Sequence, residues 1–200
     1  MSNTERRIEV ERKTKETEVR VELDFDSGEP VDIDTGLAFL DHMLHAMAFH
    51  GGFSLVVKAK GDIDVDAHHT VEDIGLVMGD ALKGALERSA GIMRYGHAVI
   101  PMDDSLFEVV VDVSGRPYLR YIASYNQERV GDFDVNLVRE FLYGLSSRGK
   151  INLHAIQRYG INAHHSIEAL FKALGRALAG AFSFSAHSGG NKGMSTKGLL

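Results

Sequence analysis

An internal repeat constrains the fold of this 200-residue chain more than any other feature. The segment His68-His69-Thr70-Val71-Glu72 matches His164-His165-Ser166-Ile167-Glu168, and the turn Ser27-Gly28-Glu29-Pro30 matches Ser114-Gly115-Arg116-Pro117. The matches keep the same order in both halves, which makes a chance origin a poor explanation. The chain is therefore predicted to consist of two similar halves that meet near residues 89–94.

Hydrophobic periodicity gives both halves the same order of strand, strand, helix, strand, helix. Strands are expected over 8–25, 31–34, 53–60, 95–100, 106–113, 118–123 and 151–156. Helices are expected over 37–50, 70–88, 137–145 and 166–181. Residues 31–34 are predicted to form a hairpin with the preceding strand, and Asp34 or Thr35 is the expected N-cap of the first helix.

This order predicts an α+β fold in which each half is a sheet with two helices on one face. The two helical layers would then bury their apolar faces against each other. We expect residues 1–90 to form the first half, residues 91–187 the second, and residues 188–200 a flexible C-terminal tail. Together they would form one functional domain.

The content of ionisable and sulfur-containing residues narrows the function. The chain has no cysteine and ten histidines, so disulfides and thiolate metal sites are excluded, and imidazole is the available metal ligand and acid–base group. A formal net charge of −6 gives no indication of nucleic-acid binding. No apolar run reaches membrane-spanning length and no secretory signal is visible, so a cytoplasmic protein is expected.

The sharpest chemical motif is His-His-x-x-Glu, which opens a predicted helix in each half. Adjacent histidines on a helix point about 100° apart, so the two members of each pair are expected to serve different metals. A single copy would fit a helix start with surface histidines, but two equivalent copies favour metal binding. Aligning the halves also places His42 opposite Glu140. The predicted ligands, four for each of two Mn or Fe ions, are His42, His68, His69, Glu72, Glu140, His164, His165 and Glu168.

These residues and their neighbours resemble the imidazoleglycerol-phosphate dehydratase family. The resemblance is carried by residues 39–44 with His50-Gly51, by 66–73, by Gly115-Arg116-Pro117, by 162–169 and by Ser195-Thr196-Lys197-Gly198. These segments are spread over essentially the whole chain in the expected order. The doubled histidine motif with these neighbours is highly specific.

The resemblance implies an enzyme of histidine biosynthesis. It would remove water from imidazole glycerol phosphate to give imidazole acetol phosphate, through an imidazolate bound to two Mn(II) ions per subunit. The family's fold is a duplicated four-stranded sheet with two helices per half. The family assembles trimers into a 24-subunit shell, with active sites between subunits. A phosphatase fused to some relatives is not expected here.

The resemblance also assigns residues, position by position. It gives the eight ligands named above, although the family often has histidine in place of Glu140. Glu16 would contact the substrate and handle the carbon-bound proton, with His50 or Glu72 as the other acid–base partner. The substrate-binding residues would be Glu16, His42, His50, His68, Glu72, Arg94, Arg116, His164, Ser195 and Lys197.

Two other functions fit the motif less well. A dinuclear metallohydrolase would use the metals to activate water against a phosphoester or amide, and would release phosphate rather than form a ketone. A structural shell would use the histidine pairs only to hold subunits together, and would turn over no substrate.

Overall fold

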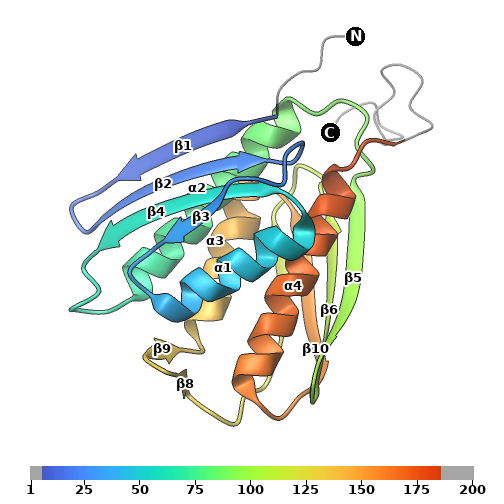
Figure 1. The fold of residues 1–200 in the computed structure, drawn as a ribbon. Helices are drawn as coiled ribbons and strands as arrows, with labels where there is room; N and C mark the ends of the chain where they lie inside the picture. The colour runs from blue at the N-terminus through green and yellow to red at the C-terminus, as the bar shows by residue number, and fades with distance from the viewer. Residues whose placement is uncertain (1–5, 186–200) are drawn as a thin grey trace.

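The computed structural model describes residues 6–185 and arranges them as two sheets with two helical layers between them (Figure 1). The first half contains β1 (Ile8–Lys13), β2 (Thr17–Asp24), β3 (Val31–Asp34), α1 (Ala38–Gly51), β4 (Ser54–Gly61) and α2 (His68–Glu87). The second contains β5 (Tyr95–Met102), β6 (Ser105–Asp112), β7 (Tyr118–Ile122), β8 (Arg129–Val130), β9 (Phe133–Asp134), α3 (Leu137–Gly149), β10 (Asn152–Tyr159) and α4 (Ala163–Phe182).

The two large sheets have the same topology. Their strand orders are β1-β2-β4-β3 and β5-β6-β10-β7, so each strand of the first half has a counterpart in the second. In both sheets the first three strands are antiparallel neighbours and the fourth runs parallel to the third. The α+β fold with duplicated four-stranded halves, predicted from the sequence, is confirmed.

The hairpin expected between residues 8–25 and 31–34 is wrong. β3 does not pair with β2; it lies parallel to β4, with Val31 opposite Leu55. β4 contributes Leu55 and Val57, both fully buried, and therefore takes the central position, where it has a neighbour on each side. Short-range turn signals could not reveal that the later strand enters between the two earlier ones.

Period-two alternation places one face of β2 in the core. Val19, Val21 and Leu23 are buried, whereas Arg20 on the opposite face donates to Glu9 of β1 at 2.7 Å. Burying an aliphatic side chain of this size contributes about 1.5–3 kcal/mol. The alternation therefore holds the sheet against the helices and leaves a charged outer face.

The helices pack across the two halves, with α1 against α4 and α2 against α3. Glycine permits a close approach at both contacts. A Cβ on Gly175 of α4 would lie 2.0 Å from the carbonyl oxygen of Met47 on α1, and one on Gly75 of α2 would lie 2.4 Å from the carbonyl oxygen of Phe141 on α3. The helices of each half lie on their own sheet, and these two close contacts join the helical layer of one half to that of the other.

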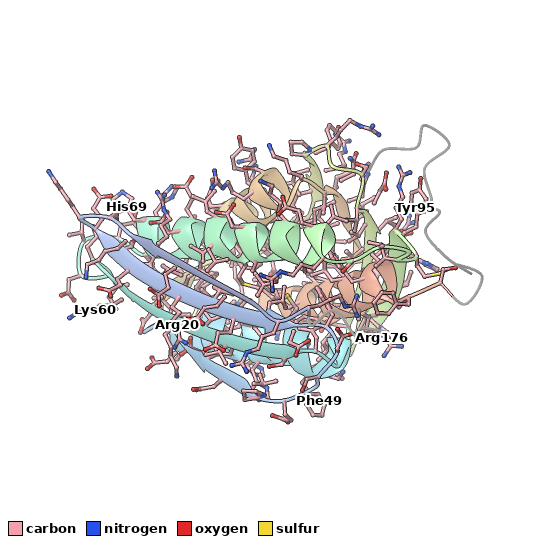
Figure 2. The ribbon with its side chains drawn as sticks, turned by 90° about the horizontal axis from the view of Figure 1, so that it is seen from above. Arg20, Phe49, Lys60, His69, Tyr95 and Arg176 are labelled. Carbon is pink, nitrogen blue, oxygen red and sulfur yellow. The ribbon has the colours of Figure 1, made fainter. Side chains whose placement is uncertain are left out.

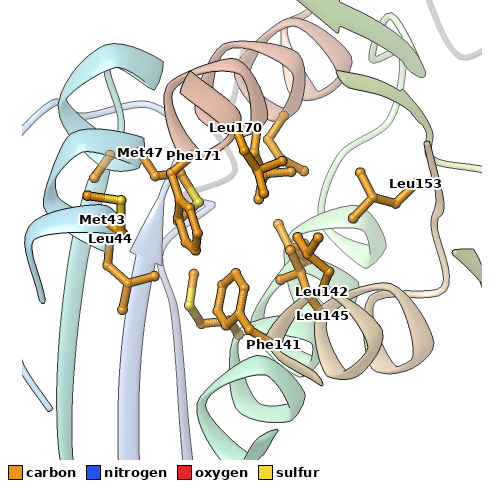
Figure 3. Packing of buried hydrophobic residues seen from close by; sticks show 14 of the residues in the cluster. Met43, Leu44, Met47, Phe141, Leu142, Leu145, Leu153, Leu170 and Phe171 are labelled. Carbon is orange, nitrogen blue, oxygen red and sulfur yellow. The ribbon is translucent and has the colours of Figure 1, made fainter. Parts of the chain in front are cut away.

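The core fills the space between these helices (Figure 3). Phe141 of α3 and Phe171 of α4 stack with their ring centroids 5.3 Å apart, and the Met43 and Met47 side chains of α1 lie beside Phe171. All four side chains are essentially inaccessible to solvent. One continuous core thus joins both halves, and it fixes the starts of the helices that carry the histidine motifs.

The first helix begins later than its expected N-cap. Leu37 is the N-cap residue of α1 and makes no capping bond through its side chain, whereas the Thr35 hydroxyl donates to Asp41 at 2.5 Å. The backbone N–H of Thr35 also donates to this carboxylate, at 2.9 Å. Asp41, in the first helical turn, therefore accepts both hydrogen bonds from Thr35 and fixes the segment that leads into α1.

Within residues 6–185, no helix combines the length and apolar character needed to cross a bilayer.

Candidate metal and active site

Both histidine pairs lie in the first turn of a helix, earlier than the predicted helix starts. His68 and His69 open α2, and His164 and His165 follow Ala163 at the start of α4. A polar side chain two residues before each pair fixes the helix end. Asp66 accepts from the backbone N–H of His68 at 3.1 Å, and Asn162 accepts from that of His164 at 2.9 Å. Each of these acceptors satisfies a backbone N–H that the helix itself leaves without a partner, and so holds the histidine pair in the first turn.

The close packing of α1 on α4 assembles one compact ligand group. His164 Nε2 lies 3.2 Å from Glu168 Oε2, and His42 Nε2 lies 3.5 Å from the same oxygen. One ligand atom from each residue lies within 4.8 Å of the others, and within residues 6–185 this is the only such group of three. Residues from both halves of the repeat therefore meet at one point.

The carboxylate of this group is held ionised. Glu168 is largely buried, which by itself raises its pKa, but the Lys172 ammonium lies 2.6 Å from its Oε1 atom, and the net effect lowers the pKa. The nearby His42 and His164 act in the same direction. An ionised carboxylate beside two imidazoles has the charge that a divalent cation requires.

The corresponding group in the first half is more open. His68 Nε2 lies 3.9 Å from Glu72 Oε2 on the next turn of α2. Glu140 lies on α3, the helix that packs against α2, and its carboxylate is 3.2 Å from the Arg139 guanidinium. The structure thus puts Glu140 on the helix expected from the repeat, but its assignment as a ligand stays a prediction.

The two histidines of each pair lie apart and have different partners. Ring centroids are 6.1 Å apart for His68 and His69 and 6.2 Å apart for His164 and His165. The first member of each pair lies near the glutamate on the next helical turn and the second near an aspartate, which fits the prediction that they serve different metals. Figure 2 shows His69 at the end of the sheet that also carries Lys60, where β4 ends and α2 begins.

Carboxylates surround these outer histidines. His69 Nδ1 lies 3.2 Å from Asp62 Oδ2 and 3.8 Å from Glu16 Oε2, and the Asp62 bond and Glu16 raise the pKa of the imidazole. His165 Nδ1 lies 2.5 Å from Asp104 Oδ1, and its Nε2 lies 3.6 Å from Asp103. The His165 bond and two backbone N–H groups hold the pKa of Asp104 well below its usual range.

Glu16 and His50, the predicted acid–base residues, lie in different settings. Glu16 is exposed in the turn between β1 and β2, and its backbone N–H donates to Thr14 Oγ1 at 3.1 Å. His50 lies in the last turn of α1, where partial burial and the positive charges of Lys172 and Arg176 lower its pKa. Glu16 therefore lies near a predicted metal ligand, His69. The lowered pKa of His50 favours its neutral form.

The predicted phosphate-binding residues are only partly described. Arg94, at a backbone φ of +67°, donates to both oxygens of Asp112, at 2.7 and 3.2 Å. Arg116 lies exposed in the turn before β7. Ser195 and Lys197 lie outside the described residues. The substrate assignments of all four stay predictions, and in this chain Arg94 already has a carboxylate partner.

The donor set fits a hard or borderline divalent metal. Donor atoms at neighbouring positions of an octahedral ion lie about 3 Å apart, close to the 3.2 and 3.5 Å separations from Glu168 Oε2 to His164 and His42. Nitrogen and oxygen donors in a chain without cysteine suit Mn(II). His42, His164 and Glu168 could therefore hold one ion, with further ligands added from elsewhere.

Sequence reasoning assigned no role to Asp62 and Lys172. Asp62 directly follows β4, in the acidic segment that leads to α2. Lys172 is four residues after Glu168, so their contact was readable from helical spacing. The contact between Asp62 and His69 spans a loop, and sequence periodicity does not describe loops.

Three comparisons place the chain among known proteins. Residues 35–178 match the family model described as imidazoleglycerol-phosphate dehydratase. The enzyme of that name from Shouchella clausii is 49% identical over 98% of this chain and 99% of its own. The crystal structure of the Staphylococcus aureus enzyme superimposes with a TM-score of 0.82 at 40% identity, covering 90% of this chain and 99% of that one. The structure of the Pyrococcus furiosus enzyme in complex with (S)-C348 superimposes with a TM-score of 0.81 at 39% identity, covering 96% of this chain and 100% of that one.

The duplicated fold, with histidine–carboxylate groups at the starts of matched helices, defines a class of hydro-lyases to which this enzyme belongs. The similarity extends over nearly the whole chain and the whole of each relative. The chain belongs to the imidazoleglycerol-phosphate dehydratase family. The family resemblance read from the sequence is thereby confirmed.

Proposed function

We propose that this protein converts imidazole glycerol phosphate to imidazole acetol phosphate and water, as a step of histidine biosynthesis. Relatives that are 49% and 50% identical to this chain carry the name of this activity. The convergence of His42, His164 and Glu168 from two halves of the chain is the structural observation that supports the proposal most directly. It supplies a polar, nitrogen-rich group where the imidazole of such a substrate could be held.

We propose two Mn(II) ions per subunit, held by the eight predicted ligands. When bound, the ions would supply Lewis-acid chemistry that lowers the pKa of the substrate's imidazole N–H and so favours the proposed imidazolate. Each imidazole ligand must be neutral at the coordinating nitrogen, and each carboxylate ionised. The lowered pKa of Glu168 meets this requirement.

The proton steps need acid–base side chains near the substrate, and one candidate, Glu72, is also a predicted metal ligand. The hydrogen removed from the substrate is bound to carbon and needs a general base within reach. Glu16 is the proposed base, because it is solvent-accessible and its carboxylate lies 3.8 Å from the His69 ring. His50 or Glu72 would return a proton elsewhere, and Arg94, Arg116, Ser195 and Lys197 would hold the phosphate.

The described ligands of one chain fall into separate groups around His42, His68, His69 and His165. We therefore propose that complete sites form between neighbouring copies, in a 24-subunit shell of trimers. We also propose that the enzyme works in the cytoplasm. A site shared between copies would make activity depend on assembly.

The test is to measure ketone formation from imidazole glycerol phosphate on a single preparation before chelation, after chelation and after Mn(II) is restored. We expect activity to be lost with the metal and to return with it. Phosphate release without ketone would indicate a metallohydrolase instead. Metal-dependent assembly with no turnover in any metal form would indicate a structural shell, and either result would overturn the proposal.

A further inference from the structure

The outer histidine of each pair is bonded through its Nδ1 atom to an aspartate that is not among the predicted ligands. His165 Nδ1 lies 2.5 Å from Asp104 Oδ1, and His69 Nδ1 lies 3.2 Å from Asp62 Oδ2. A neutral imidazole carries one proton, and a carboxylate acceptor at Nδ1 keeps it there. The Nε2 atom then carries the free lone pair that a metal requires.

The Asp104 carboxylate is fixed from the other side as well. Its Oδ2 atom accepts from the backbone N–H of Ile161 at 2.7 Å and of Asn162 at 2.8 Å. These N–H groups can only donate, so Oδ2 must be an acceptor. Asp104 thus links the turn between β5 and β6 to the start of α4, and presents its Oδ1 atom to His165 in one orientation.

We propose that Asp104 and Asp62 are positioning residues, which fix the Nδ1–H tautomers of His165 and His69 and so leave each Nε2 atom free to bind metal. The inference rests on the proposed function, in which both histidines are metal ligands. Partners of this kind orient ligand rings, and their loss commonly lowers metal affinity about 10–100-fold.

The two halves use different elements for this purpose. The turn between β5 and β6, which supplies Asp104, corresponds to the turn between β1 and β2, which contains Glu16. In the first half, Asp62 after β4 takes the closer position at His69, and Glu16 remains 58% exposed. Asp62 therefore leaves Glu16 free for the proton transfer proposed above, whereas Asp104 of the second-half turn is held by His165 and by two backbone N–H groups.

If Asp104 served only to anchor the start of α4, the variant Asp104→Asn should bind metal as the wild type does. In Asp104→Asn, the two backbone N–H groups require the amide oxygen, so the amide NH₂ must face His165 Nδ1. This arrangement keeps the anchor but moves the ring proton to Nε2. In Asp62→Asn, the amide oxygen can face His69, because Asp62 Oδ1 has no hydrogen-bond partner within the described residues.

The experiment is calorimetric titration of the metal-free full-length protein with Mn(II), together with thermal unfolding of the metal-free protein. Asp104→Asn should lower the affinity of one site about 10–100-fold, with little change in Tm. Asp62→Ala should do the same at the other site, whereas Asp62→Asn should remain within a few-fold of the wild type. Asp32→Asn, which removes an exposed carboxylate paired with Lys58, is the charge-matched control and should change neither quantity.

Wild-type affinity at both sites in Asp104→Asn would overturn the inference, and so would equal effects of alanine and asparagine at position 62. The comparison at position 62 also decides the matter if Asp104→Asn unfolds. Binding is measured without substrate, so the two proposals can fail separately. An inactive wild type with the expected affinity pattern would refute only the proposed function, and an active wild type with unchanged affinities in the variants would refute only this inference.

Discussion

The Nε2 atom of His42 lies 3.5 Å from Glu168 Oε2, although the two residues come from opposite halves of a duplicated chain. The contact exists because α1 packs on α4 rather than on the other helix of its own half. The chemistry of the site therefore depends on helix packing between the halves. The ligand chemistry and the helix packing can be tested with separate substitutions.

Glu168→Gln should abolish tight metal binding at the group formed by His42 and His164. The amide keeps the size of the side chain but removes the negative charge that the cation requires. We expect Mn(II) affinity to fall by at least about 100-fold and turnover to fall with it, as measured by titration of the metal-free protein and by the ketone assay. Glu87→Gln, at an exposed position of α2 paired with Lys83, is the control and should leave both unchanged.

Glu16→Gln should separate proton transfer from metal binding. Loss of a general base commonly lowers kcat about 10²–10⁴-fold, whereas metal content should stay at the wild-type level because Glu16 is not a predicted ligand. The measurements are steady-state kinetics and metal analysis on the same preparation. Glu18→Gln changes an exposed, lysine-paired glutamate on the adjoining strand and should have normal kinetics. Full turnover in Glu16→Gln would show that another group removes the proton.

Gly175→Ala should force α1 and α4 apart. Its Cβ would lie 2.0 Å from the Met47 carbonyl oxygen, which is backbone and cannot move aside. Overpacking of this kind costs about 1–3 kcal/mol, and each kcal/mol lowers Tm by about 2–4 °C in a domain of this size. The same shift should weaken Mn(II) binding at Glu168, which calorimetry would detect.

Gly180→Ala is the matched control on the same helix. Its Cβ would have its nearest contact, at 3.7 Å, with Gly96, which is ordinary van der Waals distance. Alanine is the better helix former, so Tm should stay the same or rise slightly. A Gly175→Ala protein as stable as Gly180→Ala would contradict the close packing described here.

Asp26 should contribute stability that depends on pH. Its hydrogen bond from Arg6, a residue only 3% exposed, lowers the pKa of the Asp26 carboxyl. A carboxyl with a lowered folded-state pKa stabilises the fold fully above its unfolded pKa of about 3.9. That contribution is then lost as the pH falls through the folded-state value.

The variant Asp26→Asn should therefore be less stable than the wild type near neutral pH, by about 1–3 kcal/mol. The difference should shrink as the pH falls below about 4, and thermal unfolding between pH 7 and pH 3 would measure it. Asp24→Asn is the control, because asparagine can still accept the backbone N–H of Asp26. A stability gap that is the same at every pH would contradict the ionic origin of the effect.

Much of the fold was predictable because its signals are local. The alternation of Val19, Val21 and Leu23 identifies the inner face of a strand, and the doubled histidine motif reveals the duplication and the helices that carry it. The eight candidate ligands could likewise be chosen from residue type and repeat position alone. These features depend on neighbours within a few residues, or on the comparison of one half with the other.

Contacts between distant segments had no such signal. Turn residues before β3 suggested a hairpin, but the central position of β4 depends on burial of Leu55 and Val57 from both sides of the strand. Asp62 reaches His69 across a turn, in which the backbone N–H groups of Val65 and Asp66 donate to the Asp62 carbonyl oxygen. Such contacts depend on the packing free energy of the whole core, so they cannot be predicted from any single segment.

The amino-acid sequence by itself determined the duplicated halves, their helices and strands, and the kinds of side chain available for chemistry, because periodicity and residue type are properties of short segments. Only the tertiary structure decided that His42 of the first half meets His164 and Glu168 of the second. Gly175 allows the backbones of α1 and α4 to approach, and the shared core holds them there. The ligand types are thus local, whereas their distances are set by long-range packing.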